Sequence, residues 1–286
     1  MPKRALRRRA KQALLLAPLL AAGCQREERE LLLATTTSVQ DSGLFDELLP
    51  LFTERTGIRV NLVAVGSGAA LRMGAEGNAD VLVTHAPQAE QELLLTGALA
   101  SRRPFMENDF LIAGPPEDPA GVAGAGSASE ALRRIAAAGA PFVSRGDDSG
   151  THRRESELLR AAGLDPEAPW PGVLRTGSGM GLALQVAGER RAYVLADLGT
   201  FLALQGRTGL AELSRPAPDL RNLYSVLRVS PERFPEVNAR GARDFEAFLL
   251  APEAQGRIAR FGSERLGRPL FRALRAAEAA PAPPAP

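Results

Sequence analysis

The chain has 286 residues, with 35 Lys or Arg against 33 Asp or Glu, two His and one Cys. The balanced charge and the lack of a basic cluster outside the N-terminal segment argue against a nucleic-acid-binding protein, and a single Cys excludes an internal disulfide. So few His and Cys residues also argue against a metal centre, while the length suffices for one large domain or two medium ones.

The N-terminal segment has the pattern of an export signal. Six basic residues stand within the first 11 positions, and a short apolar stretch follows at 13–22. That stretch is too short to span a membrane. It leads into Leu20-Ala21-Ala22-Gly23-Cys24, which is similar to a bacterial lipobox. We therefore expect a lipoprotein signal peptide at residues 1–23 and lipidation of Cys24. The alternative is an ordinary signal peptide with Cys24 as a bystander.

The expected folded part lies between a short tether and a low-complexity tail. Removal of the signal peptide takes away six basic and no acidic residues, so the rest of the chain has four more acidic than basic side chains. Residues 24–30 are a short charged tether. Residues 276–286 are an Ala/Pro-rich tail, which we expect to be disordered. Export predicts a protein of the periplasm or cell envelope.

Short apolar strands alternate with amphipathic helices in the first part of the fold. Strands are predicted at 31–34, 60–65 and 79–83, and helices at 42–55, 69–76 and 88–96. A glycine follows each of these helices as a C-cap residue. This alternation of short, continuously apolar strands with helices indicates a parallel, doubly wound sheet.

A second α/β lobe is predicted after the strand at 109–113, with the crossover placed at residues 114–116. Its strands are expected at 141–144, 173–176 and 192–196, and its helices at 128–138, 150–162, 182–189 and 201–205. A strand at 222–229 then returns to the first lobe, where helices at 235–249 and 252–261 pack. The predicted fold is α/β, with two doubly wound lobes, a double crossover and a ligand cleft. Lobe I comprises residues 31–113 and 220–275, and lobe II residues 114–219.

Three loops rich in Gly, Ser and Thr follow predicted strands: Thr35-Thr36-Thr37-Ser38, Gly66-Ser67-Gly68, and the segment from Arg145 to Thr151. Each is expected to open a helix, whose N-terminus offers unpaired N–H groups and a positive dipole end. Hydroxyl groups add further donors. One such loop alone would be an ordinary N-cap or turn. Several at the carboxyl ends of strands indicate a cage for a small oxyanion.

These residues resemble the periplasmic tungstate-binding proteins that supply ABC importers. The similarity runs from about Leu31 to Ile258, and its most specific part is Ser-Arg-Gly-Asp-Asp-Ser-Gly-Thr-His, which ends at His152. It implies a type II solute-binding fold whose lobes close on an oxyanion. Two positions depart from the family: Ser67 stands where Thr is frequent, and Leu198 follows Asp197 where Arg is frequent.

The resemblance places the ligand contacts on Thr35, Thr36, Thr37, Ser38, Ser67, Arg145, Ser149, Gly150 and Thr151. Arg145 is then the one formal cation, and its planar fork suits two oxygens of a tetrahedral dianion. Asp147 and Asp148 would repel the ligand if they faced it. We expect one of them to orient Arg145 and another to accept backbone N–H groups.

The resemblance thus implies high-affinity tungstate binding and delivery to the permease subunits of an ABC transporter, by a lipid-anchored monomer without catalytic residues, cofactor, metal site or nucleic-acid partner. Molybdate has nearly the same size and charge, and sulfate and phosphate are more distant alternatives. A serine hydrolase using Ser149 or Ser67 with His85 or His152 is an alternative of another class. Against it, the residues around Ser149 do not form a Gly-x-Ser-x-Gly elbow.

Overall fold

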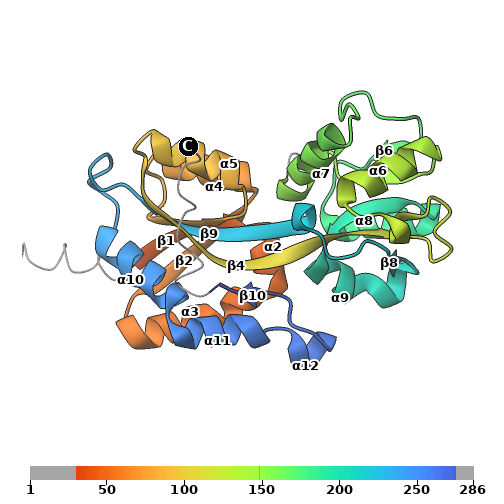
Figure 1. Cartoon of the computed structure of the whole chain (residues 1–286). Coiled ribbons are helices and arrows are strands. Elements are labelled where there is room, and N and C mark those ends of the chain that lie inside the picture. The colour runs from red at the N-terminus through yellow and green to blue at the C-terminus, as the bar shows by residue number, and fades with distance from the viewer. Residues whose placement is uncertain (1–29, 148, 275–286) are drawn as a thin grey trace, which may run out of the picture.

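Two lobes joined by two long strands make up the described part of the chain (Figure 1). The structure is a computed structural model and describes residues 30–147 and 149–274. The predicted signal peptide, Cys24, the tether up to residue 29, Asp148 and the tail lie outside these residues. Within the two described ranges, no helix combines the length and the apolar character needed to cross a membrane.

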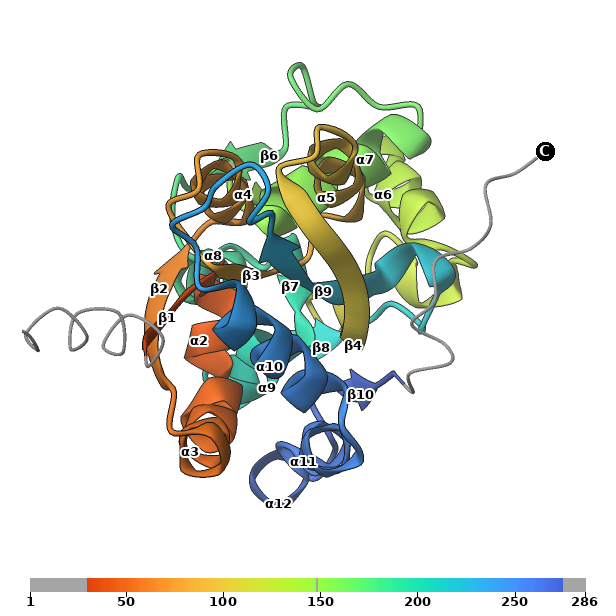
Figure 2. The ribbon, with the colours of Figure 1, turned by 90° about the vertical axis from the view of Figure 1, so that its left-hand side faces the viewer.

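Lobe I is assembled from both ends of the described chain. Its strands are β1 (Glu30–Thr36), β2 (Arg59–Val65), β3 (Val81–Thr84) and β10 (Arg272–Ala273). Its helices are α2 (Thr37–Ser42), α3 (Leu44–Thr56), α4 (Ser67–Ala75), α5 (Pro87–Leu95), α10 (Ala239–Leu250), α11 (Pro252–Arg260) and α12 (Ser263–Leu266). Helices α4 and α5 cover one face of the sheet, and α3, α10 and α11 cover the other (Figure 2). Each face buries its own apolar cluster.

Lobe II is contiguous in sequence. Its strands are β5 (Phe142–Ser144), β6 (Val173–Arg175), β7 (Tyr193–Asp197) and β8 (Ala211–Glu212). Its helices are α6 (Ala128–Ala137), α7 (Gly150–Ala161), α8 (Met180–Arg190) and α9 (Leu198–Thr208), with short 3-10 turns η1 (Val122–Gly124) and η2 (Pro218–Leu220). Strand β5 is parallel to β6 and β7. The two buried clusters of this lobe take all their core residues from positions 110–220.

The lobes are connected by β4 (Leu99–Gly114) and β9 (Arg221–Val229), which run antiparallel to each other. The strand order is β2-β1-β3-β9-β4-β7-β5-β6, and β8 and β10 also pair with β4. Strand β4 pairs with β9 as far as Asp109, and with β7 from Phe110 onward. The predicted α/β class, with two doubly wound lobes and a double crossover, is confirmed.

Strand β4 begins earlier in the chain than the strand predicted at 109–113. The lobe crossover is predicted at residues 114–116, because Gly114-Pro115-Pro116 follows that strand, and this boundary stays a prediction. Residues 107–109 all belong to β4, and their polar groups have partners within the fold. Glu107 and Asp109 accept hydrogen bonds from Arg272, at 2.9 and 2.6 Å. Asn108 accepts one from Asn222 at 2.8 Å. The chain therefore passes between lobes inside a continuous strand.

The first two glycine- and hydroxyl-rich segments form shorter connections between strand and helix than expected. Strand β1 passes directly into α2 between Thr36 and Thr37, so residues 35–38 form no loop. The helix predicted at 42–55 is split by Gly43, which has a left-handed φ of 82°. Helix α4 begins at Ser67, two residues earlier than predicted. Strands β8 and β10 and helix α12 were missed because they are too short to show a periodic pattern.

Candidate functional site

The sequence-predicted residues lie at the carboxyl ends of parallel strands in both lobes. Residues 35–38 end β1 and begin α2, and Ser67 opens α4 just after β2. Strands β1 and β2 are parallel neighbours, with Thr36 opposite Val65, so these two segments meet at one edge of the sheet. Arg145 and residues 149–151 follow β5 in lobe II. The predicted residues therefore form two groups, one in each lobe.

The hydroxyl groups at the end of β1 are unequal. Thr35 is fully buried, and its Oγ1 donates to the carbonyl of Val83 at 3.1 Å. Thr36 is the N-cap of α2, and its Oγ1 lies 3.2 Å from the Oγ of Ser38. Thr37 is exposed. The side-chain proton of Thr35 is thus already committed, whereas the hydroxyls of Thr36 and Ser38 are paired with each other.

Arg145 is held from three sides within lobe II. It is 9 % exposed, and one terminal nitrogen donates to Asp147 at 2.5 Å. The other donates to the hydroxyl of Thr151 at 3.4 Å, and Nε donates to the carbonyl of Ser178 at 3.3 Å. A guanidinium has five N–H groups. The described partners use three, which leaves one on each terminal nitrogen for an oxyanion.

Asp147 connects Arg145 to the start of α7. Its Oδ1 accepts a hydrogen bond from the backbone of Ser149 at 3.2 Å. Burial raises the pKa of Asp147, but hydrogen bonds from Ser149 and the charge of Arg145 outweigh it, and the pKa is lowered from its usual value. Ser149 caps α7 by accepting from the backbone of His152. The expectation that an aspartate orients Arg145 is confirmed for Asp147.

Four buried polar atoms at these strand ends have no hydrogen-bond partner among the described residues: Ser67 Oγ, His85 Nδ1, Ser144 Oγ and Ser178 Oγ. Ser144 ends β5, and the other three come from the β2–α4, β3–α5 and β6–α8 connections. A buried polar group without a partner costs about 1–3 kcal/mol. Ser67 belongs to the predicted set, whereas His85 and Ser178 were not in it. Unsatisfied groups gathered at these strand ends make this region the candidate ligand site.

His85 packs between the lobes beside Arg145. Its ring lies 4.9 Å from that of Tyr224 and 6.4 Å from that of Phe110. The residue as a whole is half-buried, but Nδ1 has no accessible surface. Burial lowers the pKa of the imidazole to about 4; a hydrogen bond with Asn222 opposes this shift, and the charge of Arg145 adds to it. The ring is therefore neutral at pH 7.

A buried amide network joins this region to the crossover strands. The Nδ2 of Asn222 donates to Asn108 at 2.8 Å and to the hydroxyl of Tyr224 at 2.9 Å. Burial raises the pKa of Tyr224, and hydrogen bonds to Ser38, Asn222 and Asn108 only partly oppose that shift. Tyr224 therefore connects β9 with the ligand segment after β1. The one sequence signal for this network was the polar alternation at the start of β9.

A second carboxyl group lies behind the Arg145 loop. Glu155 on α7 is 3 % exposed, and its Oε2 has no partner among the described residues. Burial raises its pKa to about 7, although the Ser144 hydroxyl, the charge of Arg175 and the backbone of Arg145 oppose the shift. In lobe I, by contrast, the buried carboxylate of Glu90 has a cationic partner, Arg102, at 2.8 Å.

Two glycines allow the lobes to approach closely. A Cβ atom on Gly68, at the start of α4, would lie 2.6 Å from a terminal nitrogen of Arg153 on α7. A Cβ on Gly150, at the start of α7, would overlap Cε1 of His85. Both contacts join lobe I to lobe II. The groups predicted in the two lobes thus face each other across a narrow interface.

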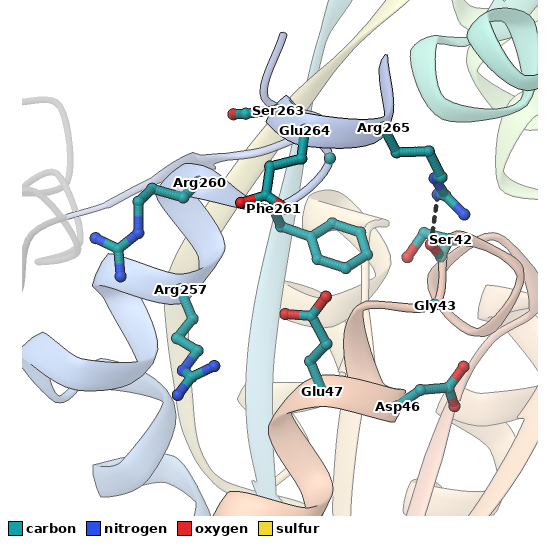
Figure 3. Close-up of a pocket in the computed structure, with 11 residues that line it drawn as sticks. Ser42, Gly43, Asp46, Glu47, Arg257, Arg260, Phe261, Ser263, Glu264 and Arg265 are labelled. Atoms are coloured by element: carbon teal, nitrogen blue, oxygen red, sulfur yellow. Dashed lines mark hydrogen bonds between the residues drawn. The ribbon is translucent and has the colours of Figure 1, made fainter. Parts of the chain in front are cut away.

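A cavity of about 600 Å³ lies elsewhere on lobe I, between the start of α3 and α11–α12 (Figure 3). Arginines and carboxylates both surround it, so their charges oppose each other and favour neither anions nor cations. None of the sequence-predicted ligand residues lines it. The residues that line the cavity are Ser42, Gly43, Asp46, Glu47, Arg257, Arg260, Phe261, Gly262, Ser263, Glu264 and Arg265. The convergence of donors described above, rather than this cavity, marks the candidate site. Within the described ranges, no group of three or more His, Cys, Asp or Glu could hold a metal ion.

Comparisons with known proteins agree with this geometry. Residues 23–253 match the model of the PBP superfamily domain. The chain is 42% identical over 243 residues to a tungstate-binding protein TupA of Peptoclostridium acidaminophilum, covering 84% of each chain. It is 44% identical over 239 residues to a putative ABC transporter anion-binding protein of Haloferax volcanii, covering 82% of this chain and 69% of that one. The solved TupA structure from Desulfovibrio alaskensis G20 has a TM-score of 0.76 and 38% identity, and the match covers 86% of this chain and 99% of that one. The predicted type II binding-protein fold is thereby confirmed.

Proposed function

The chain belongs to the PBP superfamily, and from that premise we propose that it captures tungstate outside the cytoplasm and delivers it to an ABC transporter. Relatives named as a tungstate-binding protein and as an ABC transporter anion-binding protein support this proposal. The single observation that carries it is the arrangement at Arg145: a buried guanidinium with two N–H groups that no described residue takes up, beside hydroxyls without a partner in the described part of the chain. Such a set of donors suits a tetrahedral dianion, which only accepts hydrogen bonds.

The donors are numerous enough for tight binding. We propose as ligand contacts Arg145, Thr36, Thr37, Ser38, Ser67, Ser149, Gly150 and Thr151, with Ser178 added from the structure; Thr35 contributes through its backbone position. Hydrogen bonds to charged groups contribute about 1.5–3 kcal/mol each. Six to eight of them, less the cost of ordering and desolvation, are consistent with nanomolar affinity, about −12 kcal/mol.

The ionisation of the site favours binding over hydrolysis. A serine hydrolase needs a base that accepts the hydroxyl proton near pH 7. His85, whose pKa is about 4, is too weakly basic for that role. Ser149 is occupied as the cap of α7. We therefore propose a receptor without catalytic activity, acting as a monomer that Cys24 attaches to the membrane through a lipid.

Isothermal titration of the purified protein with tungstate, molybdate, sulfate and phosphate tests this function. We expect one-to-one binding of tungstate in the nanomolar range, with molybdate clearly weaker. Equal affinity for tungstate and molybdate would make the protein a general receptor for both oxyanions. No heat with either, on a sample shown to be folded by circular dichroism, would overturn the proposal. Hydrolysis of an ester substrate by the protein would support the serine hydrolase alternative instead.

A further inference from the structure

We propose that His85 is a positioning residue that latches lobe I onto lobe II by seating its imidazole against Gly150, and so sets how long the closed form holds its ligand. The inference rests on the proposed function for its ligand, but the contact itself does not depend on which anion binds. It assigns a role to a side chain that makes no part of the predicted ligand set.

The contact leaves no room for a side chain at position 150. A Cβ there would overlap Cε1 of His85 and lie 2.8 Å from Nε2, where real Cβ atoms do not approach. Gly150 has no positive φ, so its backbone conformation does not require glycine. The lack of a side chain is therefore explained by the close approach of His85 rather than by the turn.

The imidazole has little freedom to move aside. Its ring packs 4.9 Å from Tyr224 and 6.4 Å from Phe110, and both of these residues are nearly fully buried on the crossover strands. Tyr224 in turn bonds to Asn222 at 2.9 Å. His85 is thus fixed against the strands that join the lobes, and the N-terminal turn of α7 rests on it.

The neighbouring contact, Gly68 against Arg153, provides a contrast. There the atom that a Cβ would meet is a terminal nitrogen of Arg153, a side chain with several rotatable bonds. At Gly150 the obstacle is a ring held in a buried aromatic cluster. The ring at Gly150 is therefore the more rigid of the two obstacles between the lobes.

A double-mutant cycle tests the latch, using Gly150→Ala, His85→Ala and the double variant, with Gly206→Ala on α9 as the matched control. A Cβ on Gly206 meets nothing within 4 Å, and its φ is not positive. We expect tungstate to dissociate about 30-fold faster from Gly150→Ala and about 10-fold faster from His85→Ala. The association rate should change by less than about twofold, because the open form is unaffected. The control should bind as the wild type does.

The decisive result is the non-additivity of the two changes. If the methyl group acts by striking His85, adding Gly150→Ala to His85→Ala should produce no further increase in the dissociation rate. Effects that multiply would show that the methyl group instead crowds the ligand, and would overturn the latch. An unchanged dissociation rate in Gly150→Ala would also overturn it.

A ligand-independent measurement separates the latch from the proposed function. The imidazole signals of His85 and His152 can be followed by NMR against pH, with His152→Gln for assignment. We expect His85 to titrate near pH 4 in the wild type and closer to 6.5 in Gly150→Ala. This result without tungstate binding would retain the latch and reject the function. Tungstate binding by a wild-type protein whose His85 titrates near 6.5 would retain the function and reject the latch.

Discussion

Lobe I and lobe II bring different chemistry to the interface between them. Lobe II presents a charged group that is already assembled: Arg145 is fixed by Asp147, Thr151 and the carbonyl of Ser178, all within the same lobe. Lobe I presents neutral hydroxyls, of which that of Ser67 has no partner among the residues that the structure describes. The comparison suggests a division of work, in which the cation of lobe II attracts the anion and the neutral donors of lobe I add contacts as the lobes close.

Arg145→Ala should produce the largest effect, because it removes the only cation placed among the predicted ligand contacts. Loss of two charge-assisted hydrogen bonds predicts a loss of about 3–5 kcal/mol in tungstate affinity, or more than a hundredfold. Arg145→Lys should fall between, since lysine keeps the charge but not the fork. Titration calorimetry measures both, with the exposed Arg207 of α9 changed to Ala as control. A loss no greater than that of a single hydroxyl would contradict the division of charge between the lobes.

Glu155→Gln, in lobe II, should change the stability of the protein rather than its affinity for the ligand. The pKa of Glu155 is about 7 in the folded protein and about 4.5 when unfolded, so the folded state holds an extra proton between these values. The free energy of unfolding of the wild type should therefore fall as the pH rises from about 4.5 to 7, by up to about 3 kcal/mol relative to Glu155→Gln. Urea unfolding of both proteins at several pH values measures this difference. A difference that does not change with pH would show that Glu155 is solvated.

Ser67→Ala should lower affinity without lowering stability. Its hydroxyl has no partner within the described fold, so removing it costs the free protein nothing or stabilises it slightly. The loss of one hydrogen bond to the anion predicts a decrease in affinity of about 2 kcal/mol, roughly thirtyfold. Calorimetric titration and thermal unfolding measure the two effects. Ser263→Ala, beside the cavity of Figure 3, is the control and should leave affinity unchanged. A drop in stability with intact affinity would assign Ser67 to the fold alone.

Thr35→Val should have the smallest effect on binding. The hydroxyl of Thr35 already donates to the carbonyl of Val83, so its loss should destabilise the protein by about 1 kcal/mol. Tungstate affinity should change by less than about twofold. If the affinity fell as far as in Ser67→Ala, the Thr35 hydroxyl would have to turn toward the ligand.

The sequence predicted the two-lobe α/β fold because most strands are short apolar runs that alternate with amphipathic helices. It missed the part of β4 before Asp109, where polar residues such as Glu107 interrupt the apolar pattern and their partner Arg272 is distant in sequence. The ligand role of the predicted residues stays a prediction, as do the lobe boundaries. His85 and Ser178 were missed because only the fold brings them beside Arg145.

The way the chain is divided between the lobes also has a consequence for the order in which they form during synthesis. Both clusters of lobe II are complete once residue 220 is available. The sheet of lobe I needs β9, and its larger cluster needs residues as late as Phe271. A chain made from its N-terminus therefore begins lobe I first, completes lobe II first, and finishes lobe I last. Until α10 and α11 are made, the sheet face that they share with α3 is only partly covered, which makes this half of the newborn protein the one most in need of protection from aggregation.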